Sequence, residues 1–214
     1  MVVSDARKLK IEKQIEIRKP RLLLDIDGVI VTYDFVGLVK RYFNVDIEPK
    51  AIFAYNLADV LSVSSKEIDN MFQEQVWGKP VFMDGALDTL TEISKIYEII
   101  IYSNRIKYMK EIGLVQWLVD NHIPFEGIDY GHDVYDFHID DRPEKLEDTN
   151  SSIKLLYTQP WNEGCLNIKK NLNRVNNWYE IRRFLLGNDT TCPLCGLFYE
   201  RINPNQVCPR CKGG

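Results

Sequence analysis

The chain has 214 residues, of which 45% are hydrophobic and 27% are charged, and its formal net charge is −4. This length suits one medium-sized domain with a small appendage, and the composition is typical of a globular protein. No apolar run approaches the roughly 20 residues that span a bilayer, and residues 1–20 lack the apolar core of a signal peptide. We therefore expect a soluble, cytoplasmic protein.

The charge is distributed unevenly along the chain. Eight Lys or Arg and three Asp or Glu lie between Cys165 and the C-terminus, which gives this part +5 and leaves −9 for the remainder. Such asymmetry is typical of a basic module joined to an acidic core. The eight cations are scattered, so they indicate nucleic-acid binding only weakly.

The first structural signal in chain order is a short apolar strand that ends in two carboxylates. Residues 22–26 are expected to form this strand, with Asp25 and Asp27 at its C-terminal end and Gly28 at the following bend. Ligands of open α/β sheets bind at this end of the strands. Because Asp-x-Asp-Gly is also a good turn sequence, the motif alone leaves a turn and a catalytic site open.

Residues 32–83 interrupt the strand pattern and are expected to be helical. Ser64 and Glu67 have the spacing of a capping box, which predicts a helix that starts there. An insertion of this size after the first strand is expected to form a small helical cap above the strand ends.

After residue 83, short apolar segments alternate with helical patterns. Expected strands cover 97–102, 128–130, 137–139 and 153–157, and expected helices cover 85–95, 107–121 and 171–186. In the helix over 107–121, we expect Ile112, Val115 and Val119 to face the core. Strands separated by helices predict an α/β fold with a doubly wound parallel sheet.

Polar side chains follow two further strands. Ser103 and Asn104 come after the second strand and could bond phosphate oxygens, although a strand-end Ser-Asn is also an ordinary helix cap. Asp140 and Asp141 follow a later strand and should lie near Asp25 and Asp27 at the same sheet edge. Converging carboxylates repel one another, and Mg²⁺ is the usual cation that answers this repulsion beside phosphates.

These residues resemble the haloacid dehalogenase-like phosphatases, in motifs one (Asp25 to Val29), two (Ser103-Asn104) and four (Ile139 to Arg142). The resemblance is nearest to the 5'(3')-deoxyribonucleotidases, covers about residues 21–186, and includes a small cap in the same place. It is carried also by Gly85 to Asp88, by His122 to Phe125 and by Trp178 in the closing helix.

The resemblance implies a fold, a reaction and roles for the site residues. Asp25 would be the nucleophile that becomes a phospho-aspartate, and Asp27 the general acid and base. Ser103 would bind the transferring phosphoryl group, with Asn104 beside it. Asp25, the backbone carbonyl of Asp27, Asp140 and Asp141 would hold Mg²⁺.

The chain departs from the family at one position. Relatives have a lysine shortly before the Asp-Asp strand, where this chain has Gly131-His132-Asp133. His132 could replace the lysine only when protonated, and it could equally be a surface loop residue. Lys145, or Arg105 and Lys107, could instead supply the positive charge next to nucleophile and phosphate.

The C-terminal segment carries two Cys-x-x-Cys knuckles, formed by Cys192, Cys195, Cys208 and Cys211. Four thiolates at this spacing predict a structural Zn²⁺ site, because so short a segment cannot bury a core alone. Two disulfides are the alternative, which a reducing compartment and the odd Cys165 disfavour. Phe198, Tyr199 and Arg201 could stack on bases or buttress the ribbon.

The sequence thus predicts an N-terminal extension (1–20), a phosphatase-like core (21–187) and a zinc ribbon (188–214). The expected function is that of a Mg²⁺-dependent phosphomonoesterase, a hydrolase acting on a small phosphorylated metabolite, with (deoxy)nucleoside monophosphates as the expected substrates. Two alternatives stay open. One is a catalytically weakened binding or regulatory protein, and the other is a nucleic-acid end phosphatase that uses the ribbon to contact nucleic acid or a partner.

Overall fold

The computed structural model describes residues 18–32, 34–47, 57–76, 80–163, 172–187, 189–191 and 198–200. The five cysteines and most of the expected N-terminal extension lie outside these ranges. The predicted Zn²⁺ ligands Cys192, Cys195, Cys208 and Cys211 are therefore not among the described residues.

The centre of the protein is a six-stranded sheet in the order β5-β4-β1-β6-β7-β8, in which every pairing is parallel. The strands are β1 (Arg21–Leu24), β4 (Glu98–Ile101), β5 (Gly127–Ile128), β6 (Val134–Asp140), β7 (Asn150–Tyr157) and β8 (Leu172–Val175). Strand β1 lies between β4 and β6. The parallel α/β sheet predicted from the sequence is confirmed.

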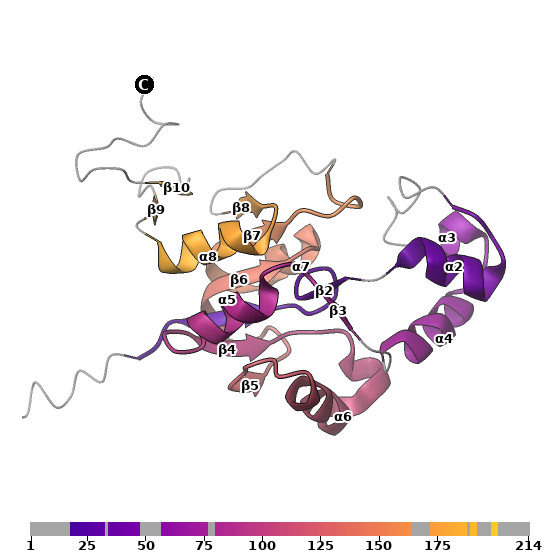
Figure 1. The fold of residues 1–214 in the computed structure, drawn as a ribbon, viewed down its shortest axis with the longest axis horizontal. Helices are drawn as coiled ribbons and strands as arrows, with labels where there is room; N and C mark the ends of the chain where they lie inside the picture. The colour runs from indigo at the N-terminus through magenta and orange to yellow at the C-terminus, as the bar shows by residue number, and fades with distance from the viewer. Residues whose placement is uncertain are drawn as a thin grey trace, which may run out of the picture.

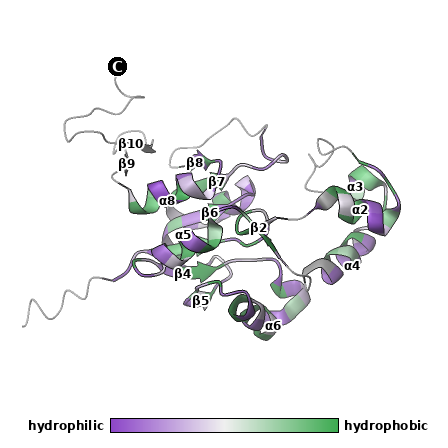
Figure 2. Ribbon diagram, in the orientation of Figure 1, coloured by the Kyte–Doolittle hydropathy of each residue, from purple (hydrophilic) through white to green (hydrophobic). Residues whose placement is uncertain are grey.

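Helices pack against the sheet according to the alternation of its side chains. Leu22 and Leu24 of β1 belong to a large core that also includes residues of α5 (Ala86–Ile93), α6 (Ile106–Asp120) and α8 (Trp178–Leu186). Leu23 belongs to a separate cluster with Ile100 and Tyr135. Figure 1 shows α5 and α8 in front of the sheet, and Figure 2 shows β4 as a hydrophobic strand.

The predicted closing helix over 171–186 is wrong in its first part. Leu172–Val175 instead form strand β8, which pairs with β7, and the helix begins only at Trp178. The side chain of Asn177 caps this helix by accepting a hydrogen bond from the backbone N–H of Glu180 at 2.9 Å. Leu172 and Val175 are three residues apart, a spacing that fits one face of a helix. Pairing with β7 stabilises the same segment as a strand, so tertiary contacts override the local pattern. The short helix α7 (Pro143–Asp148) was not predicted.

The predicted buried face of the helix over 107–121 is also wrong. Ile112 is 81% exposed and Val119 is 55% exposed, whereas Leu114 and Leu118 are fully buried. Lys110 interrupts the helix with φ 57° and ψ 172°, which changes the direction of the turns that follow. The sequence offers two apolar stripes here, and the one that contains Leu114, Trp117 and Leu118 faces the core.

The described part of the insertion after β1 contains three helices, α2 (Phe35–Phe43), α3 (Leu57–Leu61) and α4 (Ser65–Val76). It leaves and re-enters the core through β2 (Val31–Thr32) and β3 (Val81–Phe82), which pair antiparallel. These helices form their own small core and lie together beside the sheet domain (Figure 1). The capping box is confirmed, since Ser64 Oγ accepts from the Glu67 N–H and Glu67 Oε2 accepts from the Ser64 N–H.

Two contacts with the larger domain bear on the placement of this helical insertion. Tyr108 of α6 donates a hydrogen bond to Asp69 of α4 at 2.8 Å. Met83, directly after β3, donates its backbone N–H to the carbonyl oxygen of Ile30 at 2.9 Å. The insertion therefore touches the segments that follow β1 and β4, two of the three strands whose ends carry predicted site residues.

The C-terminal segment contributes β9 (Asp189–Thr191) and β10 (Phe198–Glu200), which pair antiparallel. Among the described helices, none has both the length and the apolar character needed to cross a bilayer.

The corrected face of α6 can be tested with two truncations. Leu118→Ala should lower the free energy of unfolding by about 2–5 kcal/mol, because it leaves a cavity in the core. Ile112→Ala should change it by no more than about 0.5 kcal/mol, because Ile112 is exposed. Urea unfolding of both variants measures this difference. Equal losses would contradict the burial described here.

Candidate active site

The predicted site residues follow three neighbouring strands. At the end of β1, Asp25 donates its backbone N–H to the carbonyl oxygen of Ile139 in β6 at 3.1 Å. On the other side, Tyr102 after β4 donates its backbone N–H to the carbonyl oxygen of Leu24 at 2.9 Å. Because the strands are parallel and in register, the residues that follow them meet at one edge of the sheet.

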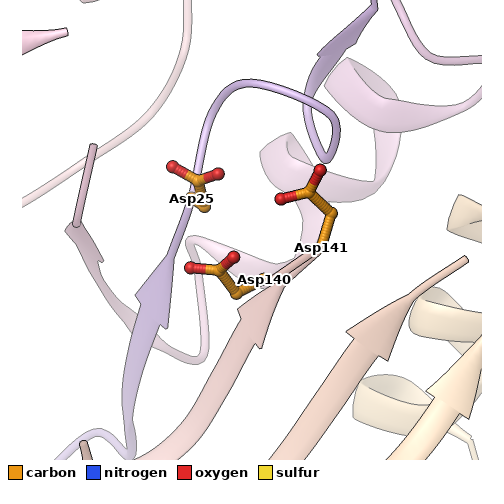
Figure 3. A group of neighbouring side chains, drawn as sticks. All are labelled: Asp25, Asp140 and Asp141. Carbon is orange, nitrogen blue, oxygen red and sulfur yellow. The ribbon is translucent and has the colours of Figure 1, made fainter. Parts of the chain in front are cut away.

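Three carboxylates converge at this edge. Asp25, Asp140 and Asp141 each place an oxygen within 4.8 Å of the others (Figure 3). Asp140 is 2% exposed and Asp141 is 4% exposed. The sequence predicted this convergence, and the structure brings these three side chains together.

Burial and mutual repulsion make the charged form of this cluster costly. Burial raises the pKa of Asp25 well above its usual range, and the charges of Asp140, Asp141 and Asp27 raise it further. Burial also raises the pKa of Asp140 to about 7. The pKa of Asp141 is raised well above its usual range by burial and then by Asp140. Without a cation, this site therefore favours bound protons near neutral pH.

Gly28 lets the chain turn closely over this cluster. Its φ of +84° lies in the left-handed region, and a Cβ atom built there would come within 2.3 Å of Asp141 Oδ2. Any other residue would therefore be strained and would also collide with Asp141. The glycine is required both by the turn that the sequence predicted and by this close approach.

Asp27 lies next to the cluster but has a different partner. Its carboxylate accepts hydrogen bonds from Arg105 Nε at 3.0 and 3.1 Å and from Arg105 Nη2 at 2.9 Å. Arg105 is 2% exposed, and its guanidinium stacks over the Trp117 ring at 4.0 Å. This buried cation fixes the direction of the Asp27 side chain, which is 32% exposed.

Ser103 and Asn104 lie where the sequence placed them, between β4 and α6. Ser103 Oγ accepts a hydrogen bond from the backbone N–H of Arg105 at 3.3 Å, and the Asn104 carbonyl accepts from Lys107 at 3.0 Å. Ser103 therefore supports the turn before α6. Since Arg105 pairs with Asp27, the same turn also positions the cation beside that carboxylate.

Lys145 and His132 occupy different places relative to the carboxylates. Lys145 donates a hydrogen bond to Tyr102 Oη at 2.6 Å, and its charge helps to lower the pKa of Asp140. His132 is exposed in the loop before β6, and the adjacent Asp133 pairs with Arg21 at the start of β1. The structure thus brings Lys145, but not His132, toward the carboxylates.

A buried histidine, His138, lies next to Asp140 and carries no charge. His138 Nε2 is 3.5 Å from Asp140 Oδ2, and His138 Nδ1 is hydrogen-bonded to Thr149 Oγ1 at 2.7 Å. Burial lowers the pKa of His138 to about 3, and nearby Lys154 and Lys145 act in the same direction. His138 is therefore neutral at physiological pH and does not offset the carboxylate charges.

Sequence reasoning missed the residues that hold Asp141. Trp161 Nε1 donates to Asp141 Oδ2 at 2.8 Å, and Asn162 Nδ2 donates to the Asp141 carbonyl oxygen at 2.7 Å. Both follow β7, the next strand of the sheet. The available signal was the group of polar residues Thr158, Gln159 and Asn162 after the apolar end of a predicted strand, the same kind of pattern that identified the other strand ends.

The donor set fits a divalent magnesium ion. Three carboxylates with close oxygen atoms offer hard ligands, and their raised pKa values show a surplus of negative charge that a cation would neutralise. Lys145 and Arg105 supply some positive charge, but Arg105 is directed at Asp27. The described cluster is therefore suited to Mg²⁺ beside an anionic ligand.

No protein-family model matches the chain, and no curated protein matches its sequence. Solved structures do match. A haloacid dehalogenase-like family hydrolase from Streptococcus pneumoniae has a TM-score of 0.52 at 17% identity, covering 78% of this chain and 98% of the other. A phosphoserine phosphatase in its apo form (TM-score 0.43, 11% identity) covers 78% and 100% of the two chains. The Streptococcus structure shows that this chain has the haloacid dehalogenase-like fold.

The raised pKa values predict how stability depends on pH and Mg²⁺. Between the usual aspartate value of 3.8 and about 7, folded Asp140 keeps a proton that the unfolded chain has lost. Stability of the metal-free protein should therefore fall as the pH rises through this window. Mg²⁺ should raise the melting temperature more at about pH 8 than at about pH 5, because it replaces the proton as counter-charge.

Thermal unfolding with and without Mg²⁺ at both pH values measures this effect. Asp140→Asn removes one charge and should reduce both the pH dependence and the stabilisation by Mg²⁺. An equal gain from Mg²⁺ at both pH values would show that the cluster does not bind the ion in place of protons.

Proposed function

We propose that this protein is a Mg²⁺-dependent phosphomonoesterase, a hydrolase that acts through a phospho-aspartate on Asp25. The observation that carries the proposal is the convergence of Asp25, Asp140 and Asp141 at the ends of two adjacent parallel strands. The haloacid dehalogenase-like fold and the sequence motifs support the same assignment. Mg²⁺ held by Asp25, Asp140, Asp141 and the Asp27 backbone carbonyl would neutralise the phosphoryl oxygens.

The first step forms a bond between Asp25 and phosphorus. An Asp25 carboxylate oxygen attacks the phosphoryl group, and the bond from phosphorus to the leaving alkoxide breaks. Asp27 gives its proton to this alkoxide. In the second step, water attacks the phospho-aspartate, its proton passes to Asp27, and inorganic phosphate leaves as the Asp25 carboxylate is restored.

Arg105 has a positioning role in this scheme. Its bonds to both oxygens of Asp27 hold that carboxylate toward the position of the leaving group. These hydrogen bonds have to loosen before Asp27 can give a proton to the leaving group. A phosphate dianion is a competing partner for a guanidinium, and substrate binding provides such a partner.

Ser103, Asn104 and Lys145 complete the phosphate site. Ser103 and Asn104 follow β4, which pairs with β1, and would bond the transferring phosphoryl oxygens. Lys145 takes the place of the family's lysine, although it comes after the Asp-Asp pair in the sequence. Its influence on the pKa of Asp140 supports this assignment over His132.

The substrate is a small phosphorylated metabolite, and the nucleotidase-like motifs favour (deoxy)nucleoside monophosphates. The helical insertion, which contacts α6 through Tyr108 and Asp69, acts as the cap over the site. Cys192, Cys195, Cys208 and Cys211 bind a structural Zn²⁺ in a C-terminal ribbon. Strands β9 and β10 come immediately before and shortly after the first knuckle, as in such a ribbon.

Replacement of the nucleophile tests the reaction directly. Asp25→Asn should reduce phosphate release by about 10³-fold or more, because the amide cannot form the covalent intermediate. Released phosphate is measured with an aryl phosphate, mononucleotides and phosphorylated oligonucleotides as substrates, each with Mg²⁺. The circular dichroism spectrum should be unchanged, which shows that folding is retained.

The same substrate panel separates the proposed function from its alternatives. Preference for mononucleotides supports a nucleotidase. Preference for phosphorylated oligonucleotides would identify a nucleic-acid end phosphatase. If the wild-type chain hydrolyses none of the three with Mg²⁺, the enzyme proposal fails, and a binding or regulatory role replaces it.

The assignment of Lys145 predicts contrasting effects of two substitutions. Lys145→Met should lower kcat/KM by about a hundredfold, because it removes a cation near the transferring phosphoryl group. His132→Ala should leave kcat/KM unchanged, because His132 is exposed before β6. Steady-state kinetics of both variants with one substrate decide the matter. The reverse pattern would assign the role to His132.

A further inference from the structure

The segment after β7 reaches the acidic cluster from a strand that carries none of the predicted site residues. We call residues 158–163 the β7 loop. Its start is fixed to β8, since Thr158 donates its backbone N–H to the carbonyl oxygen of Val175 at 2.8 Å. Gln159 Nε2 donates to the carbonyl oxygen of Gly28 at 2.6 Å, in the turn after Asp27. Hydrogen bonds thus connect the β7 loop both to strand β8 and to the turn at Gly28, which follows Asp25 and Asp27.

Asn162 is the anchor of the β7 loop. It is fully buried, and its amide group donates to the carbonyl oxygens of Asp141 and Tyr157, both at 2.7 Å. Its side-chain oxygen accepts from the Gln159 N–H at 3.1 Å and from Arg174 at 2.8 Å. With its amide donors and its acceptor all used, Asn162 can adopt only one orientation. The adjacent Trp161 is consequently held in a defined position.

Trp161 then contacts the acidic cluster through its one polar atom. Its indole N–H donates to Asp141 Oδ2 at 2.8 Å, and its ring lies against Gly28, where a Cβ atom would come within 3.2 Å. An indole can only donate, so this bond suits the carboxylate form of Asp141. It fixes the direction of a carboxylate that would share a cation with Asp25 and Asp140.

We propose that Trp161 is a positioning residue for the metal site, whose indole N–H orients Asp141 for binding Mg²⁺. This inference rests on the proposed function, because it assumes that the carboxylate cluster binds Mg²⁺. Groups that hydrogen-bond to a metal ligand set its orientation, and their loss typically weakens metal affinity about 10- to 100-fold. The β7 loop therefore acts on the metal without contacting it.

The test is the affinity of the substrate-free, full-length protein for Mg²⁺ alone, measured by calorimetric titration. Trp161→Phe removes the N–H and keeps an aromatic ring, and it should weaken Mg²⁺ binding about tenfold or more. Trp161→His restores a ring N–H donor and should recover part of the affinity. Both variants are compared with wild type at one pH and ionic strength.

Trp178→Phe is the matched control. Trp178 is buried and, like Trp161, donates its indole N–H, but to the backbone carbonyl oxygen of Val29 at 2.7 Å. The same chemical change should lower the urea midpoint of unfolding and leave Mg²⁺ affinity at the wild-type value. It separates orientation of a metal ligand from general destabilisation.

The outcomes distinguish this inference from the proposed function. If wild type binds Mg²⁺ and Trp161→Phe binds it equally well, the positioning role is wrong and the metal site stands. An equal loss of affinity in Trp161→Phe and Trp178→Phe would also overturn the role, because the effect would then follow stability. If wild type binds no Mg²⁺, the metal site and the role of Trp161 fail together.

Discussion

Three carboxylates repel one another at one edge of the sheet, and the contacts around them hold them there. Asp25, Asp140 and Asp141 are brought within 4.8 Å of one another by strands that are paired in register. Burial of such a group costs free energy, and the raised pKa values of all three express that cost. A fold retains an arrangement of this kind at a site where a cation and an anionic substrate offset it.

The surroundings of the cluster keep it fixed while its charges repel. Gly28 lets the main chain pass close to Asp141, where a Cβ atom would collide with its carboxylate. Next to the cluster, Arg105 holds Asp27 by hydrogen bonds to both carboxylate oxygens, and the guanidinium of Arg105 stacks on the Trp117 ring. Each of these residues restricts the direction of a carboxylate. The restriction preorganises the site, because little reorientation is needed when ligands bind.

The sheet core and the helical insertion have different roles. The sheet core supplies the carboxylates and their immediate partners from β1, β4, β6 and β7. The helical insertion has a hydrophobic core of its own and touches α6 through Tyr108 and Asp69. In the proposed function, the sheet core performs the chemistry that all substrates share. The insertion then provides the surface by which substrates are distinguished.

Much of the fold and of the candidate site could be predicted from local sequence. Asp25, Asp27, Ser103, Asp140 and Asp141 each follow an apolar segment directly, and parallel pairing brings such positions to one edge. Other features were predicted wrongly because two local patterns were equally acceptable. Leu172 and Val175 fit a helix or a strand, and α6 carries two apolar stripes. Packing against β7 and the kink at Lys110 decided between them.

The parallel sheet and the residues at its strand ends follow from the amino-acid sequence, because apolar periodicity and strand-end chemistry are properties of neighbouring residues. Which side chains become partners depends on how the elements pack in three dimensions. The pairing of Arg105 with Asp27, the bond from Lys145 to Tyr102 and the bond from Trp161 to Asp141 join segments separated along the chain. Such contacts depend on strand order and loop path, and residue spacing within one segment does not encode them.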